Sequence, residues 1–105
     1  MVKVHKAADG RLKQIIEVGG NSFFSDVPEA HGGDSAGPEP HDLLDAALGS
    51  CTALTVTMVA RRKQMPLEDV RVEVTRGESG GLYTLNRRIE LVGALTPEQR
   101  EYLLG

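Results

Sequence analysis

The sequence predicts an α+β fold: a β meander at the N-terminus, one long central helix, and a C-terminal β hairpin followed by a helix. Three observations carry this prediction. Short alternating segments separated by turn residues occupy the first quarter of the chain. A long segment with helical spacing of apolar residues begins at Pro40. Two strictly alternating runs joined by a glycine-rich turn follow Pro66.

Length and composition are typical of one globular domain. The chain has 105 residues, of which 40% are hydrophobic and 26% charged, and its net charge is −3. We therefore expect one domain over residues 1–105, without the composition of a disordered or a nucleic-acid-binding protein. The N-terminus has no apolar signal segment, and no run approaches the ~20 apolar residues of a membrane span. These features predict a cytoplasmic protein that binds neither nucleic acid nor membrane.

The N-terminal meander is predicted from alternation and from two turns. Val2 and Val4 alternate with polar residues, and Asp9-Gly10 is a strong hairpin signal. Further strands are expected at residues 11–18 and 22–26, on either side of the turn at 19–21. The next segment, residues 27–40, is rich in proline and glycine. It is either a structured loop or lid, or a flexible linker.

The central helix is bounded by strong start and stop signals. Pro40 suits the first helical position, and Asp42 complements the positive end of the helix dipole. Arg61 and Arg62 complement the negative end, and Pro66 ends the helix. The span is about 23 residues, or roughly 35 Å.

This helix has apolar residues on two opposite sides. The stripe around Cys51 is expected to face the core, and small residues on the other side would allow another backbone to come close. One modest sheet covers only one side, so the pattern predicts a homodimer built around this helix. Coverage of both sides by strands of the same chain is the alternative. The first stripe consists of Leu44, Ala47, Leu48, Cys51, Leu54, Thr55 and Met58, and the second of Ala46, Gly49, Ala53, Val56 and Ala60.

The C-terminal part predicts a hairpin and a short helix. Residues 70–74 and 82–92 alternate, with a turn at 77–81 between them. On the second strand, an apolar row begins at Tyr83, and Arg87 interrupts it. Most such arginines extend to the edge of the sheet or form a structural ion pair or hydrogen bond. Thr96-Pro97-Glu98-Gln99 is a capping box that starts a helix.

The segment from Gly32 to Ala53 resembles the central motif of the OsmC-like family, which includes the organic hydroperoxide resistance proteins. Its most specific parts are Gly32-Gly33, Gly37-Pro38-Glu39-Pro40-His41-Asp42 and Gly49-Ser50-Cys51-Thr52-Ala53. The resemblance implies an intertwined homodimer with its two active sites at the subunit interface. It also implies a thiol peroxidase that acts in oxidative stress defence and reduces organic hydroperoxides or hydrogen peroxide through Cys51.

The same resemblance implies partners for Cys51. The family uses a second, C-terminal cysteine and an arginine with a partner carboxylate. This sequence has one cysteine and ends at Gly105. The C-terminal part of the usual domain is expected to be missing, so we expect Cys51 to be recycled by an external thiol reductant or by a cysteine in that missing part. His41 occupies the position of the family's carboxylate and Asp42 follows it, while Arg11 best matches the arginine. Cys51, Arg11 and Asp42 are accordingly the predicted catalytic residues.

Cys51 needs a nearby cation to react as a thiolate. A free cysteine has a pKa of about 8.5 and is only slightly ionised at neutral pH. Cys51 lies too far into the helix for the dipole to act on it, and Arg61 and Arg62 are roughly 15 Å farther along the axis. Three arginines remain as candidates, namely Arg11, Arg87 and Arg88.

The sequence leaves two functions other than a peroxidase open. In the first, the protein is a catalytically inactive OsmC-like dimer that binds a small molecule or a partner, with Cys51 as a packing residue. In the second, a metal is bound by His5, His31 and His41, whose spacing matches no ligand pattern. We therefore expect no metal and no cofactor.

Overall fold

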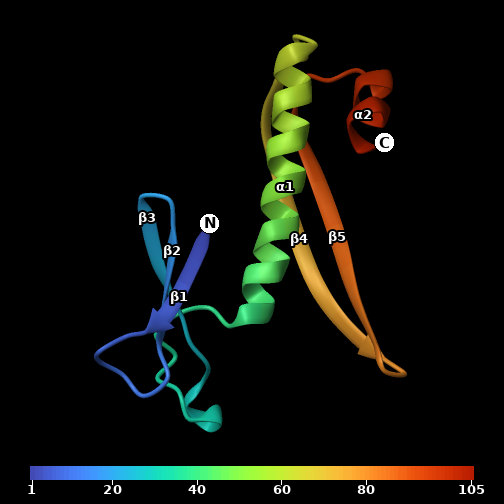
Figure 1. Cartoon of the computed structure of the whole chain (residues 1–105). Coiled ribbons are helices and arrows are strands. Elements are labelled where there is room, and N and C mark those ends of the chain that lie inside the picture. Colours follow the sequence, from blue (N-terminus) through green and yellow to red (C-terminus); the bar gives the residue numbers. More distant parts are fainter. The chain divides into compact units, whose positions relative to one another are not determined.

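The computed structural model describes the backbone of all 105 residues and every side chain except those of Glu78, Ser79 and Tyr83. The predicted start of the apolar row at Tyr83 therefore lies outside the described side chains. The structure has two compact units, Met1–Leu44 and Asp45–Gly105. In chain order the elements are β1 (Val2–Lys6), β2 (Gln14–Val18), β3 (Asn21–Ser25), the 3-10 helix η1 (Glu29–His31), α1 (Pro40–Arg62), β4 (Leu67–Ser79), β5 (Leu82–Gly93) and α2 (Pro97–Leu104) (Figure 1). The predicted α+β class and the order of its elements are confirmed.

The first unit holds the antiparallel sheet β1-β2-β3. The register aligns Val4 with Ile16 and Ile16 with Phe23, which places these three side chains on one face of the sheet. Ile16 is buried there, whereas Val4 and Phe23 are exposed. Strand β2 begins at Gln14, later than predicted, because residues 11–13 belong to the turn that the Ala7 N to Lys13 O bond closes at 2.9 Å.

The segment after β3 is a structured loop organised by the carboxylate of Asp26. One oxygen accepts the backbone N–H of Val27 at 2.8 Å, and the other accepts those of Asp34 at 3.1 Å and Ala36 at 3.0 Å. These hydrogen bonds, first from Ala36 and then from Val27, lower the pKa of Asp26. A Cβ at Gly33 would overlap the backbone carbonyl of Val27 and lie 2.6 Å from a carboxylate oxygen of Asp26, so only glycine fits there.

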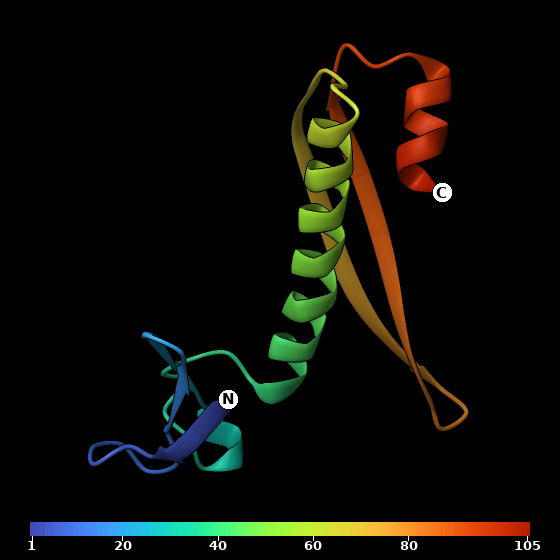
Figure 2. The ribbon, with the colours of Figure 1, turned by 45° about the horizontal axis from the view of Figure 1, so that its top comes forward.

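In the second unit, α1 lies along the hairpin β4–β5, and α2 lies beside the C-terminal half of α1 (Figure 2). A cluster of buried apolar residues joins the three elements: Val56, Ala60, Leu91, Leu95 and Leu103. The capping box predicted at Thr96 is present. Arg100 fixes α2 to the end of β5, since its guanidinium donates to the carbonyls of Leu91 and Gly93, both at 3.0 Å.

The face of α1 that packs on the hairpin is opposite to the one predicted. The small-residue face meets β4, where a Cβ at Gly49 would lie 3.5 Å from Val74, and Val56 and Ala60 are buried on this side. The stripe around Cys51 is exposed instead, with Leu54 60% and Met58 58% accessible. The prediction was wrong because the small side chains, and not the larger ones, allow the helix to approach the hairpin closely.

Helix α1 is also more apolar than expected. Of its 23 residues only Thr52, Val56 and Ala60 are buried, although most of the helix is apolar. By length and composition alone this helix reaches the range of a membrane span, which corrects the expectation that no segment would. The core helix of a soluble protein has the same length and composition. Helix α1 therefore leaves a large apolar surface uncovered within one chain.

The Asp26 loop leads to a pH-dependent prediction. The lowered pKa of Asp26 means that its ionised form stabilises the fold. This contribution is complete above the unfolded-state pKa of about 3.9 and is lost as the pH falls through the lower folded-state pKa. We expect Asp26→Asn to lower the urea midpoint at pH 7, measured by far-UV circular dichroism, and the difference to shrink in acid. Glu17→Gln on exposed β2 is the control, and equal midpoints at pH 7 for Asp26→Asn and the native chain would contradict the prediction.

Candidate functional site

Cys51 lies halfway along α1 with its side chain exposed, and it borders a pocket formed by α1, β5 and the end of α2. The pocket has a volume of about 250 Å³. Its lining is mainly apolar and consists of Leu48, Cys51, Thr52, Thr55, Val56, Arg87, Ile89, Leu103, Leu104 and Gly105. The thiol therefore opens onto a hollow in which an apolar group is protected from water on several sides.

Among the residues that the structure describes in this lining, Arg87 is the one with a charged side chain. Its Nη1 donates a hydrogen bond to Thr52 Oγ1 at 2.8 Å, and this hydroxyl in turn donates to the carbonyl of Leu48 at 2.8 Å. Thr52 is buried, with 7% of its surface exposed. A cation from β5 is thus held against the residue that follows Cys51 in the chain.

A second cavity adjoins the first. Its volume is about 350 Å³, and it shares Thr55, Val56, Leu103 and Gly105 with the Cys51 pocket. Val59 and Tyr102 complete its lining. We refer to these two adjoining, mainly apolar cavities together as the trough, and Cys51 and Arg87 border the first of them.

The other two predicted catalytic residues lie in the first unit. Arg11 Nε donates to Asp34 at 3.1 Å, its backbone N–H donates to the same carboxylate at 2.9 Å, and its Nη2 donates to the carbonyl of Gly33. These bonds, the backbone one first, lower the pKa of Asp34. Asp42 accepts the backbone N–H of Glu39 at 3.0 Å, at the start of α1. Cys51 and Arg87 belong to the second unit, so Arg87 is the candidate arginine that shares a described pocket with the thiol.

The role of Thr52 was only half predicted. Thr52 and Thr57 both donate from the hydroxyl to the helix backbone, to the carbonyls of Leu48 and Ala53 at 2.8 and 2.7 Å. The contact of Thr52 with Arg87 was missed. The available signal was Arg87 itself, a charged residue in a row whose apolar neighbours on β5 face the helix.

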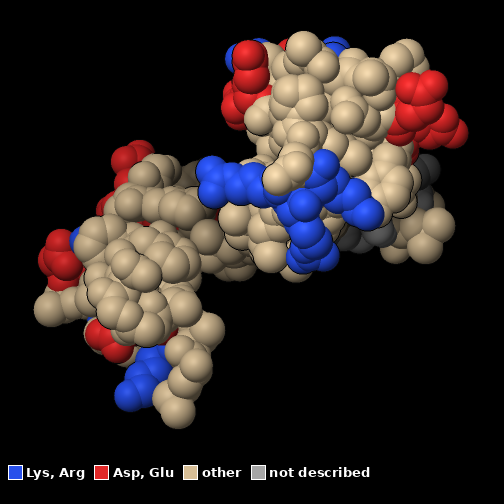
Figure 3. All heavy atoms as spheres, turned by 90° about the horizontal axis from the view of Figure 1, so that it is seen from above, with Lys and Arg blue, Asp and Glu red and all other residues tan. Residues whose placement is uncertain are grey.

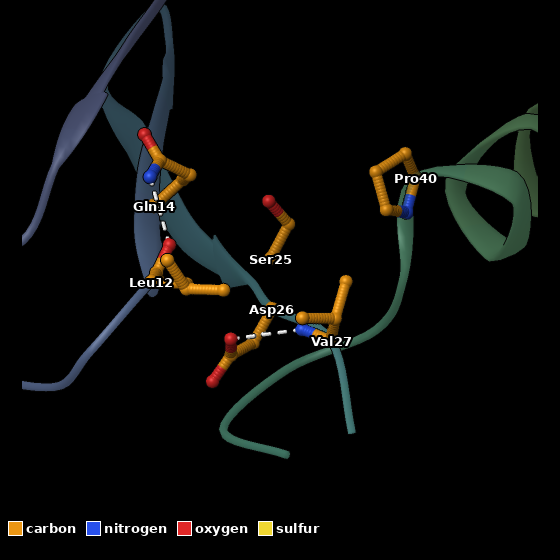
Figure 4. A pocket seen from close by; sticks show the side chains of 6 residues that line it. All are labelled: Leu12, Gln14, Ser25, Asp26, Val27 and Pro40. Carbon is orange, nitrogen blue, oxygen red and sulfur yellow. Dashed lines mark hydrogen bonds between the residues drawn. The ribbon is translucent and has the colours of Figure 1, made fainter. Parts of the chain in front are cut away.

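A smaller cavity of about 120 Å³ lies in the first unit (Figure 4). Leu12, Val27 and Pro40 border it, while the carboxylate of Asp26 is turned to the loop that it organises. Its lining is almost entirely apolar, and its carboxylate is already bonded. This cavity offers a packing space and no reactive group.

Basic residues gather at the C-terminal end of α1. The last turn of α1 carries Arg61 and Arg62, and a view from above shows basic side chains grouped at this end with acidic ones to either side (Figure 3). Among the residues that the structure describes, no three His, Cys, Asp or Glu side chains come close enough to hold a metal ion.

Comparison with known proteins supports the resemblance seen in the sequence. Residues 32–104 match the family model described as OsmC-like protein. The chain belongs to the OsmC-like family. The matched segment contains all of α1, the hairpin and α2, and thus every residue that lines the Cys51 pocket except Gly105. No curated protein matches the sequence.

Solved structures share the fold of this OsmC-like chain. An osmotic stress induced and detoxification response protein from Psychrobacter arcticus has a TM-score of 0.79 at 20% identity, covering 98% of this chain and 77% of its own. An OsmC like protein from Mycoplasma pneumoniae has a TM-score of 0.79 at 16% identity, with 99% and 76% covered. An organic hydroperoxide resistance protein from Legionella pneumophila has a TM-score of 0.63 at 21% identity, with 99% and 77% covered. At these identities the likeness establishes the fold.

Proposed function

We propose that this OsmC-like protein is a thiol-dependent peroxidase that reduces organic hydroperoxides or hydrogen peroxide through Cys51 in oxidative stress defence. The observation that carries the proposal is the exposed thiol of Cys51 in a largely apolar pocket whose described charged side chain is Arg87. Membership of the OsmC-like family and the fold shared with an organic hydroperoxide resistance protein support it.

The proposed reaction uses the thiolate as the nucleophile. The sulfur attacks one peroxide oxygen, the O–O bond breaks, and the leaving alkoxide takes a proton to become an alcohol, or water if the substrate is hydrogen peroxide. Cys51 is oxidised to a sulfenic acid. A guanidinium near the sulfur favours both the thiolate and the developing negative charge on the leaving oxygen.

An external thiol would complete the cycle. The sulfenic acid condenses with a first thiol and releases water, and a second thiol then attacks the mixed disulfide and returns Cys51 to its reduced form. This route follows from the single cysteine of the sequence. The apolar walls of the trough suit the alkyl group of an organic hydroperoxide.

Arg11 and Asp42 remain proposed partners of Cys51 beside Arg87. Arg11 is bonded to Asp34 and Gly33, so it would have to exchange these bonds for the sulfur. Arg87 needs no such exchange, because it already lines the pocket. We propose Arg87 as the principal cation of this site.

The protein is further proposed to act as a cytoplasmic homodimer. Leu54 and Met58 lie on the same uncovered side of α1 as Cys51, and a second copy of the chain would remove this apolar surface from water. A partner on this side would also border the Cys51 pocket and close it further.

A second candidate is a catalytically inactive dimer that binds a small apolar molecule. The larger cavity favours it, since its lining of Thr55, Val56, Val59, Tyr102, Leu103 and Gly105 contains no nucleophile with a neighbouring base. In that case Cys51 would serve as a wall of the trough.

Replacing Cys51 by serine separates these two candidates. We expect the native chain to consume cumene hydroperoxide in the presence of dithiothreitol, and Cys51→Ser to reduce this rate to the uncatalysed level, because a serine hydroxyl is a far weaker nucleophile at neutral pH. Peroxide loss is followed by a colorimetric assay. Equal rates of peroxide consumption for the native chain and Cys51→Ser would contradict the peroxidase proposal and favour the inactive, ligand-binding dimer.

Three arginine variants rank the proposed cations. We expect Arg87→Gln to lower the second-order rate constant for peroxide reduction about tenfold to a hundredfold, the size expected for loss of one charge-assisted interaction. Arg88→Gln is the matched control, because it alters the neighbouring residue, which alternation places on the other face of β5. A larger loss in Arg11→Gln than in Arg87→Gln would assign the principal role to Arg11.

The dimer proposal predicts the effect of a charge on the uncovered side of α1. Leu54 is 60% exposed within one chain, so Leu54→Glu leaves the packing on the hairpin intact while it places a charge in the proposed interface. We expect light scattering to give twice the 11.3 kDa chain mass for the native protein and the single mass for Leu54→Glu. Thr75→Glu on exposed β4 is the control, and a native monomer at micromolar concentration would refute the dimer.

A further inference from the structure

We propose that Thr52 is a positioning residue that holds the guanidinium of Arg87 beside the thiol of Cys51. The inference rests on the proposed function of Cys51 and adds to it a residue whose side chain takes no part in the reaction itself. Its basis is the chain of two hydrogen bonds that runs from the carbonyl of Leu48 through Thr52 to Arg87.

The hydroxyl of Thr52 can play only one part toward Arg87. A hydroxyl has one proton and two lone pairs. Its proton is used by the carbonyl of Leu48 at 2.8 Å, so a lone pair is left to accept from Arg87 Nη1, also at 2.8 Å. The helix backbone thus fixes the direction of the acceptor that Arg87 meets.

Burial makes this acceptor difficult to replace. Thr52 is only 7% exposed, so bulk water does not compete freely for its hydroxyl. Arg87 itself belongs to an exposed position of β5, and a long arginine side chain without a fixed acceptor samples many rotamers. The bond to Thr52 therefore selects the rotamers that keep the guanidinium in the pocket.

The shared pocket links Thr52 to the thiol. Cys51, Thr52 and Arg87 all line it. A guanidinium bound to Thr52 is therefore held in the pocket that Cys51 borders. Loss of the hydroxyl would not remove the charge but would let it leave the pocket.

Thr57 offers a matched comparison on the same helix. It donates to the carbonyl of Ala53 at 2.7 Å, the same bond that Thr52 makes to Leu48, but it lies outside the lining of the Cys51 pocket. A substitution of Thr57 by valine therefore removes an equivalent bond to the helix backbone without touching Arg87.

The experiment measures the alkylation rate of Cys51 by iodoacetamide between about pH 6 and pH 9, since only the thiolate reacts at an appreciable rate. We expect Thr52→Val to slow the reaction at pH 7 by about tenfold and to move the rise of the rate to higher pH, as Arg87→Gln does. Thr52→Ser should stay within about twofold of the native chain because it keeps the hydroxyl. Thr57→Val should match the native chain, and circular dichroism verifies that each variant is folded.

A double-mutant cycle decides whether Thr52 acts through Arg87. If it does, Thr52→Val combined with Arg87→Gln is no slower than Arg87→Gln alone. Two results would overturn the inference: if the rate reductions of the two single variants multiply in the double variant, or if folded Thr52→Val is alkylated at the native rate. Alkylation needs no peroxide, so this test is independent of the peroxidase assay. If the cycle gives the expected result but the native chain consumes no cumene hydroperoxide, the peroxidase proposal is refuted and the positioning role stands.

Discussion

The small side chains on one face of α1 let the helix lie close against its own hairpin, and the second unit is arranged around this contact. Gly49 faces Val74 across the interface, while Val56 and Ala60 are buried farther along. A helix positioned in this way turns its larger apolar residues, and Cys51 among them, to the outside. The same contact brings Thr52 within hydrogen-bond distance of Arg87 on β5, so packing determines which arginine lines the Cys51 pocket.

This arrangement separates the tasks of the site among different elements. In the proposed site, the helix would provide the nucleophile and the buried acceptor and β5 the cation, while α2 forms part of the apolar wall. Each part rests on a bond to the backbone: Thr52 on the carbonyl of Leu48, and α2 on the contacts of Arg100 with the end of β5. Backbone anchors of this kind leave few alternative positions for the groups that they hold, which is what a preorganised site needs.

The sequence was sufficient for the elements and for the family, and less so for the site. Turn residues, capping signals and alternation are local, so α1, the hairpin and the start of α2 were predicted near their observed positions. The packed face of α1 was mistaken because size and hydrophobicity do not tell whether a residue faces a sheet or a second subunit. Arg87 was one of three candidates, since pairing of β5 with a particular turn of α1 is a long-range property that spacing does not contain. Nothing in the sequence distinguishes Thr52 from a threonine whose hydroxyl bonds only to its own helix.

One feature of the trough bears on how relatives of this chain could come to differ from it. Leu103 and Gly105, which border both cavities, belong to the short terminal element and not to the helix that holds the nucleophile. Exchanges in this last element would widen or narrow the trough while the sulfur, the hydroxyl and the guanidinium stay where they are. Selection for ligands of another size can therefore act on this element alone, without changing the surroundings of the Cys51 thiol.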